Sequence, residues 1–276
     1  MNNFTQRAIT GAVFVIVLIG SILFSQYSFF ALFLLITILG IWEFYRLIEA
    51  VDCRPQRLFG TFTAALLFVI SAWAVSNATS LLVFFFIIPV LFLMMIFELF
   101  SKSEKPFINI AVTLLGIFYV GVSFSLLNFI AFPEINPQTG YSPHILLGMI
   151  FMIWANDTGA YLIGSKFGKH KLFERISPGK TWEGSIGGAF FAALTVFIIS
   201  IYFKEIELMD WMMISFIVIV FGTLGDLVKS LLKRSIGVKD SGTILPGHGG
   251  ILDRFDSIIM AAPFVLLYIV LRFHLM

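Results

Sequence analysis

The stretch from Ser230 to Asp256 gathers charged residues, a histidine and several glycines in a chain that is otherwise 59% hydrophobic. On either side of the start of this stretch, Asp226, Lys229, Ser230 and Lys233 recur at helical spacing, so a carboxylate, two ammonium groups and a hydroxyl share one face of a helix. Placing an ionisable side chain in or near a membrane costs several kcal/mol unless the charge is paired or takes part in a function. Their density here predicts a functional site.

Two kinds of group in this stretch and just before it could act on a phosphorylated substrate. Asp226, Asp253 and Asp256 offer hard oxygen ligands of the kind that Mg²⁺ prefers. The glycine-rich turn at residues 246–250 lets backbone N–H groups approach an anion closely. Carboxylates for a metal beside lysines and arginine for phosphate predict phosphoryl or nucleotidyl transfer.

Polar residues also appear earlier, at the end of one apolar run and at the start of the next. Asp157 and Tyr161 are four residues apart and fall on one helical face. For Asp157, a carboxylate held by Thr158 or by a helix end is the structural alternative to a role in the site.

The segment SPGKTWEG, residues 177–184, follows a loop rich in lysine. Ser177, Pro178 and Gly179 predict a tight turn, and Lys180 and Thr181 then lead into a helix. A turn of this kind resembles a phosphate cradle, although it is not a Walker A sequence. The flanking lysines alone could also reflect a cytoplasmic loop.

Composition predicts an all-α, polytopic integral membrane protein. Only 12% of the 276 residues are charged, and apolar runs long enough to cross a bilayer recur along the chain. Basic residues fall in alternate loops, with only Lys204 and Arg272 of the 18 Lys and Arg residues on the other side. This asymmetry predicts a cytoplasmic N-terminus and an external C-terminus. We expect about nine spans, centred near Ile16, Ile36, Leu67, Phe86, Val120, Met152, Ala193, Ile217 and Val265.

The two parts of the chain differ in character. Residues 1–105 form plain apolar spans and are expected to be a transmembrane scaffold, whereas residues 106–276 carry the polar motifs and are expected to be the catalytic region of one integrated membrane domain. We expect the first run, at residues 8–24, to be an uncleaved helix rather than a signal peptide. Glu43 and Glu98 lie near span ends, where an interfacial position is favoured over a catalytic one.

Several classes of function are excluded by composition. Cys53 is the sole cysteine, so the chain has no intrachain disulfide, and there is no Cys/His metal pattern. Basic residues lie in loops between spans rather than on a dedicated domain, so nucleic-acid binding is not expected.

The stretch SLLKRSIGVKDSGTILPGHGGILDRFD resembles the signature of the CDP-diacylglycerol synthase (phosphatidate cytidylyltransferase) family. The NDTGAY and SPGKTWEG segments resemble the same family, so the likeness covers residues 154–256, and the first hundred residues match only as generic spans. One departure is Gly179, where family members often carry a second lysine.

The resemblance implies that CTP and phosphatidate react to give CDP-diacylglycerol and pyrophosphate, at the cytoplasmic face of a bacterial inner membrane. It is compatible with a homodimer and leaves a second metal ion open. We assign Mg²⁺ to Asp226, Asp253 and Asp256. The expected catalytic residues are Asp226, Lys233, Arg234, Lys239, Asp240, His248 and Asp253, with a structural role in the glycine turn as the alternative for His248. The expected substrate-binding residues are Asn156, Asp157, Ser177, Lys180, Thr181, Ser230 and Arg254.

Three other interpretations share some of these features. A polyprenol or dolichol kinase, or an archaeal-lipid cytidylyltransferase, would also be polytopic and handle CTP. A secondary transporter would explain polar residues and glycines within spans, but it would not require lysines and aspartates in cytoplasmic loops.

Overall fold

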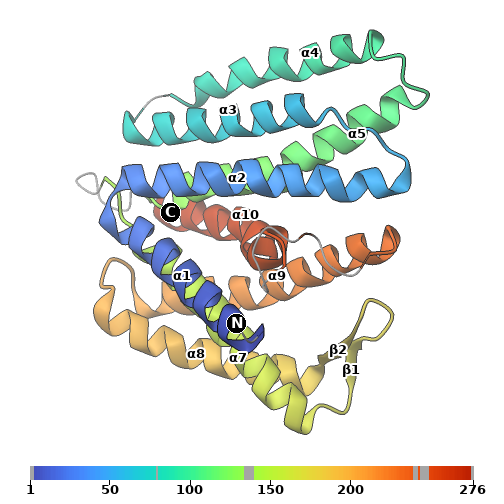
Figure 1. Cartoon of the computed structure of the whole chain (residues 1–276). Helices are drawn as coiled ribbons and strands as arrows, with labels where there is room; N and C mark the ends of the chain where they lie inside the picture. The colour runs from blue at the N-terminus through green and yellow to red at the C-terminus, as the bar shows by residue number, and fades with distance from the viewer. Residues whose placement is uncertain (1–2, 79, 134–139, 239–241, 243–248, 275–276) are drawn as a thin grey trace. The chain divides into compact units, whose positions relative to one another are not determined.

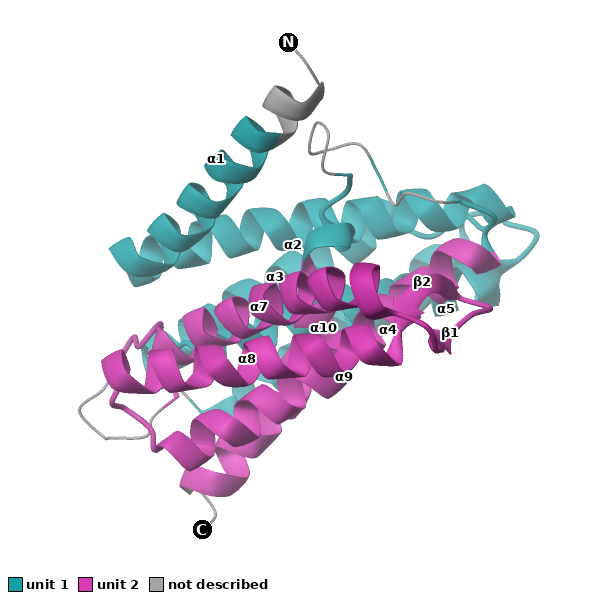
Figure 2. Ribbon diagram, turned by 90° about the horizontal axis from the view of Figure 1, so that it is seen from below, with its two compact units in different colours: residues 1–132, 236–254 teal, residues 133–235, 255–276 magenta. Residues whose placement is uncertain are grey.

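The structure is a computed structural model that describes residues 3–78, 80–133, 140–238, 242 and 249–274. The predicted site residues Lys239, Asp240 and His248 lie outside the described residues. The chain forms two compact units, coloured separately in Figure 2: residues 1–132 with 236–254, and residues 133–235 with 255–276.

Within the described part of the chain, eight helical segments are long and apolar enough to cross a membrane. This confirms the prediction of an all-α, polytopic membrane protein. Nine spans were expected, and the ninth candidate is the first helix, α1 (Asn3–Phe24). Its apolar part, Ala8–Phe24, is shorter than the eight segments. The eight segments are Gln26–Val51, Arg57–Ser76, Leu81–Leu99, Pro106–Ile130, His144–Phe167, Trp182–Tyr202, Leu208–Ser235 and Leu252–Phe273.

The first unit contains the N-terminal helices shown in blue to green in Figure 1. Its longest helix, α2, begins after Ser25, whose hydroxyl accepts a hydrogen bond from the Ser28 amide at 3.2 Å and so caps the helix. After α1, the elements are α2 (Gln26–Ile48), η1 (Glu49–Val51), α3 (Arg57–Ser76), η2 (Leu81–Phe86), α4 (Ile87–Leu99), α5 (Pro106–Gly116), the π-helical turn η3 (Ile117–Val122) and α6 (Ser123–Ile130).

Aromatic side chains form the core of the first unit. Phe33 of α2 and Phe124 of α6 are fully buried and meet edge to face. Tyr45 is fully buried too, and its hydroxyl donates to the Thr113 carbonyl at 2.8 Å. These contacts hold α2 on both α5 and α6. Helix α2 also carries Glu43.

The second unit contains α7 (His144–Phe167), α8 (Trp182–Tyr202), α9 (Leu208–Ser235) and most of α10 (Leu252–His274). Helices α7 and α8 pack closely at Gly188, where an added Cβ would lie 2.5 Å from Asn156 Oδ1 and 2.6 Å from the Asn156 carbonyl oxygen. Small residues allow helices to approach in this way inside a bilayer. Trp211, in the first turn of α9, is fully buried, and its indole N–H donates to the Phe203 carbonyl at 3.2 Å.

A short hairpin joins α7 to α8. Strand β1 (Lys171–Phe173) pairs antiparallel with β2 (Ser177–Thr181), and the turn lies at residues 174–176. The predicted tight turn at Ser177–Gly179 is therefore wrong, because those residues belong to β2. Pro178 is tolerated there because both strands of a two-stranded hairpin are edge strands.

Candidate active site

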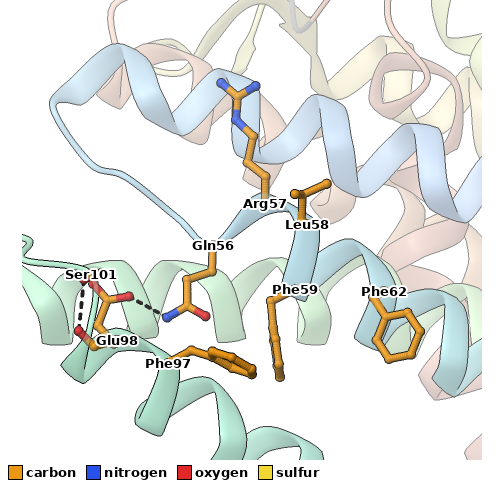
Figure 3. A pocket seen from close by; sticks show the side chains of 8 residues that line it. All are labelled: Gln56, Arg57, Leu58, Phe59, Phe62, Phe97, Glu98 and Ser101. Carbon is orange, nitrogen blue, oxygen red and sulfur yellow. Dashed lines mark hydrogen bonds between the residues drawn. The ribbon is translucent and has the colours of Figure 1, made fainter.

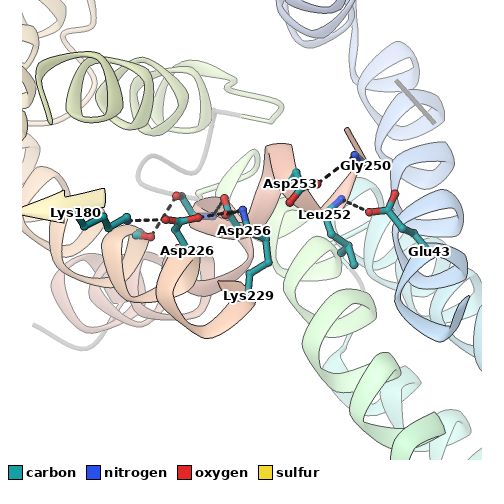
Figure 4. A network of polar contacts seen from close by, with 10 residues as sticks. Glu43, Lys180, Asp226, Lys229, Gly250, Leu252, Asp253 and Asp256 are labelled. Atoms are coloured by element: carbon teal, nitrogen blue, oxygen red, sulfur yellow. Dashed lines mark hydrogen bonds and ion pairs between the residues drawn. The ribbon is translucent and has the colours of Figure 1, made fainter. Parts of the chain in front are cut away.

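Four charged side chains of the second unit form a chain of alternating ion pairs (Figure 4). Asp226 Oδ2 lies 2.6 Å from Lys180 Nζ, and Asp226 Oδ1 lies 3.0 Å from Lys229 Nζ. Lys229 also forms an ion pair with Asp256 Oδ2. We call Lys180, Asp226, Lys229 and Asp256 the ion-pair cluster. It unites three segments that are well separated in the sequence.

The hairpin and the start of α8 place Lys180 in this cluster. Thr181, the next residue, is buried and caps α8, since its hydroxyl oxygen accepts a hydrogen bond from the Gly184 amide at 3.1 Å. Glu183 in the first turn of α8 accepts the amide N–H groups of Lys169 at 3.1 Å and His170 at 3.2 Å. The strand end that carries Lys180 is thus fixed on the helix.

Close packing of α9 on α10 brings Asp226 and Asp256 to the same lysine. At Gly225 an added Cβ would lie 2.5 Å from the Asp256 carbonyl oxygen, so only glycine allows the two helices to meet here. The Ser257 hydroxyl donates to the Gly222 carbonyl at 3.2 Å and holds the same contact one turn away. Asp226 and Lys229 are three residues apart on α9, as the helical spacing predicts.

Burial differs along the cluster. Lys229 and Asp256 are each 7% exposed, whereas the side chains of Asp226 and Lys180 are each 29% exposed. A buried charge that loses its partner costs about 3–5 kcal/mol, so Lys229 and Asp256 each need the other. Asp226 and Lys180 are the members that an incoming ligand can reach.

The aspartates provide the donors that a magnesium ion would need. Among the described residues, no group of three or more His, Cys, Asp or Glu is placed to hold a metal. However, Mg²⁺ usually takes only one or two protein carboxylates, and substrate phosphates and water complete its coordination. Asp226 and Asp256 converge on Lys229 Nζ, so two carboxylates are already directed at one point. This donor set fits Mg²⁺.

Asp253 belongs to the first unit and is held by the glycine turn before α10. Its Oδ2 accepts a hydrogen bond from the Gly250 amide at 3.3 Å (Figure 4). In the same unit, Glu43 of α2 accepts the amide N–H groups of Ile251 at 2.7 Å and Leu252 at 3.2 Å. Two carboxylates therefore fix the turn that begins α10.

Of the three polar residues singled out in α7, one is buried and two are exposed. Asn156 is 8% exposed, and its buried Oδ1 has no hydrogen-bond partner in the described part of the chain. Asp157 is exposed, as is Tyr161 at 75%. Neither Asn156 nor Asp157 belongs to the ion-pair cluster.

The remaining predicted residues lie at the ends of the same elements. Thr181 acts as the cap of α8. Ser177 in β2 and Ser230 and Lys233 in α9 are half-buried, and Arg234 and Arg254 are exposed. Their roles toward a substrate stay predictions.

Sequence reasoning assigned no role to two residues that the structure places in these networks. Lys229 lies between two carboxylates, and its spacing from Asp226 was the available signal. Glu43 lies near the end of its span as expected, but it is 3% exposed and bonded to the start of α10. A carboxylate within an apolar run signals a function by itself. Glu98, also near a span end, is 5% exposed and accepts the Gln56 side-chain amide at 2.5 Å.

A separate pocket of about 660 Å³ lies in the first unit between α3 and α4 (Figure 3). Its walls are mostly apolar, and none of the predicted site residues lines it. The lining residues are Gln56, Arg57, Leu58, Phe59, Phe62, Phe97, Glu98 and Ser101.

Comparison with known proteins gives a consistent result. The model of the cytidylyltransferase family matches residues 5–272. The phosphatidate cytidylyltransferase of Staphylococcus aureus (strain COL) is 43% identical over 174 residues, which cover 62% of this chain and 64% of that protein. Proteins of the same name from Staphylococcus haemolyticus and Staphylococcus saprophyticus are 43% and 41% identical with the same coverage. The chain therefore matches slightly less than two thirds of the length of these curated relatives.

Proposed function

This chain belongs to the cytidylyltransferase family, and we propose that it transfers the cytidylyl group of CTP to phosphatidate, releasing CDP-diacylglycerol and pyrophosphate. The observation that carries the proposal is the ion-pair cluster, in which two carboxylates and two ammonium groups alternate across three elements. The names of the relatives support the choice of substrates, and the match to the first of them covers 64% of its length.

The reaction is a displacement at phosphorus. An oxygen of the phosphatidate phosphate forms a bond to the α-phosphorus of CTP, while the bond from that phosphorus to the bridging oxygen of the β-phosphate breaks. The electron pair leaves with pyrophosphate. A phosphomonoester has a second pKa of about 6, so at neutral pH it is mostly a dianion and needs no general base. The obstacle is repulsion between two anions, which fixed cations and a metal offset.

The residues of the cluster take different roles in this proposal. Asp226 and Asp256 would hold Mg²⁺, which when bound neutralises phosphate charge and polarises the phosphorus centre. Lys180, whose side chain is half-buried, would contact a phosphate oxygen. Lys229 holds the two carboxylates together at a fixed spacing, since it bonds to both. Asp253, three residues before Asp256 on α10, is proposed as a further ligand.

Other charged residues are proposed for the phosphates and the nucleotide. Cations in the last turn of α9, beyond it in the sequence, and at the start of α10 would bind the triphosphate. Polar residues of α7 and β2 would lie nearer the nucleotide. The first group is Lys233, Arg234, Lys239 and Arg254, and the second is Asn156, Asp157, Ser177 and Thr181, with Ser230, Asp240 and His248 as further members of the signature.

The membrane setting follows from the substrates. A lipid with two acyl chains stays in the bilayer, whereas CTP is soluble and abundant in the cytoplasm. We therefore propose that the site faces the cytoplasm from a bacterial inner membrane. The placement of all but two of the Lys and Arg residues in loops or toward helix ends on one side of the predicted topology supports this orientation.

Labelled CTP tests the reaction directly. Purified protein in mixed micelles with Mg²⁺ and phosphatidate is given CTP labelled at either the α- or the γ-phosphate. We expect the α-label in the lipid phase and the γ-label in pyrophosphate, with both lost when EDTA removes the metal. A γ-label in the lipid would instead identify a kinase. No label in the lipid from either CTP would overturn the proposal.

A further inference from the structure

We propose that Glu43 is a positioning residue for the reaction: from α2 it holds the glycine turn at the start of α10, and with that turn the carboxylate of Asp253. The inference rests on the proposed function, because Asp253 matters as a metal ligand only if the chain performs metal-assisted transfer. Glu43 itself touches neither substrate nor metal in this proposal.

Hydrogen bonds join Glu43 to the start of α10. The Glu43 carboxylate accepts two successive backbone N–H groups, those of Ile251 at 2.7 Å and Leu252 at 3.2 Å. The first N–H groups of a helix have no partner within the helix, and a carboxylate there is also favoured by the helix dipole. Glu43 thus supplies from 208 positions away what a capping residue normally supplies from the same turn.

Glycines of the signature segment fit closely against the Glu43 carboxylate. An added Cβ on Gly242 would lie 3.0 Å from Glu43 Cδ, and one on Gly250 would collide with the Glu43 carboxylate. Gly249 has a φ of +83°, a conformation that favours glycine. The backbone of the signature segment can therefore approach the Glu43 carboxylate only because these positions lack side chains.

The contact of Glu43 with the turn is also linked to Asp253. Three successive amides are bonded to carboxylates: that of Gly250 to Asp253 Oδ2 at 3.3 Å, and those of Ile251 and Leu252 to Glu43. Asp253 is half-buried, so its carboxylate keeps some access to a ligand. Because Glu43 fixes the two amides that follow Gly250, it fixes the orientation of the bond that Asp253 makes. Partners of this kind set the geometry of metal ligands, and their loss typically costs about 10–100-fold in metal affinity or activity.

Glu43→Gln tests this role, and Glu98→Gln is the matched control. Both glutamates are buried in the first unit, and both accept N–H hydrogen bonds, those of Glu98 coming from the side chains of Gln56 and Asn109. We expect Glu43→Gln to lower kcat about 10–100-fold and to raise the Mg²⁺ concentration for half-maximal rate, because its amide cannot accept both N–H groups. KM for CTP should change much less. Glu98→Gln should keep the Mg²⁺ dependence of the wild type even if its melting temperature falls equally.

Two measurements without turnover complete the test. Hydrogen–deuterium exchange of the peptide covering residues 249–256 should become faster in Glu43→Gln and stay unchanged in Glu98→Gln, and Mn²⁺ binding followed by electron paramagnetic resonance should weaken only in the former. If Glu43→Gln does not fold, Glu43→Asp, which keeps the charge but shortens the side chain, should show the same changes to a smaller degree.

The outcomes separate the two proposals. Normal exchange and metal response in the Glu43 variants, or equal changes in Glu98→Gln, would overturn the positioning role. A wild-type protein that transfers no label would overturn the proposed function, while the exchange experiment would still decide whether Glu43 anchors the turn.

Discussion

Asp226 is the residue on which the ion-pair cluster depends, because it is the one carboxylate bonded to both lysines. Lys229 has a second partner in Asp256, whereas Lys180 has no other ion pair among the described residues. Removal of the charge at Asp226 would leave Lys180 without an ion pair in the described part of the chain, whereas Lys229 would keep its ion pair with Asp256. The lost ion pairs would affect the more exposed end of the cluster, at Lys180, more than its buried end, at Lys229 and Asp256. The exposed end is the one that a nucleotide can reach.

We expect Asp226→Asn to reduce label transfer at least about 100-fold, as when a group that stabilises transition-state charge is removed. Asp210→Asn is its control on the same helix. Asp210 is 2% exposed and paired with Arg272 at 3.0 Å and Tyr268 at 2.7 Å, near the opposite end of α9. Both variants should remain monodisperse on size exclusion, and only Asp226→Asn should lose activity. Wild-type turnover in Asp226→Asn would remove this residue from the mechanism.

At the scale of elements, the site depends on two helix contacts that glycine makes possible. Gly188 sets the distance from α8 to α7, and Gly225 sets the distance from α9 to α10. The first contact supports the hairpin that carries Lys180, since β2 continues directly into α8. A change in helix spacing would therefore move a lysine of the cluster without altering any of its charges.

Gly188→Ala should destabilise the protein by about 1–3 kcal/mol, because the new methyl group meets the carbonyl oxygen of Asn156 at 2.6 Å and the helices must move apart. Gly20→Ala is the control, since nothing lies within 4 Å of a Cβ at that position. It should leave stability unchanged or raise it by up to about 1 kcal/mol through helix propensity. Thermal unfolding in detergent measures both. Equal melting temperatures for the two variants would contradict the packing argument.

The sequence was most informative about features that depend on local spacing. Apolar runs predicted the helices, and the three-residue spacing of Asp226 and Lys229 predicted their shared face on α9. The β1–β2 hairpin was missed because Ser177, Pro178 and Gly179 have the composition of a turn, and only pairing with β1 makes them a strand. The bond from Glu43 to Ile251 could not be predicted either, because nothing local indicates a partner 208 residues away.

At the scale of the whole molecule, the chain is an integral membrane protein with two compact units. Each unit is built from two stretches that are not continuous in the sequence. Residues 236–254 belong with the N-terminal helices, and α10 begins in one unit and continues into the other. Large apolar side chains are exposed on the spans, for example Phe92 of α4 and Phe197 of α8, as expected of surfaces that face lipid. The division of labour between residues 1–105 and 106–276 stays a prediction.

The orientation of the spans can be tested with the natural cysteine. Cys53, between α2 and α3, is the sole cysteine of the chain and is half-buried. We expect a membrane-impermeant maleimide to label it in inverted vesicles and not in intact cells. In a Cys53→Ser background, Glu174→Cys in the hairpin turn should behave like Cys53. Glu207→Cys, exposed between α8 and α9, should show the opposite pattern, and the reverse results would invert the proposed topology.

The bond between Glu43 and the start of α10 has a consequence for biogenesis. During translation, α2 leaves the ribosome before residues 251–252 have been synthesised. Glu43 therefore enters the bilayer without the two backbone N–H groups that donate hydrogen bonds to it in the finished protein. Until the last helix is inserted, this span carries a carboxylate that disfavours lipid by several kcal/mol. Insertion of the final segment removes that penalty, which couples completion of the chain to closure of the N-terminal bundle. Nascent chains truncated before α10 should therefore be the preferred targets of membrane quality control.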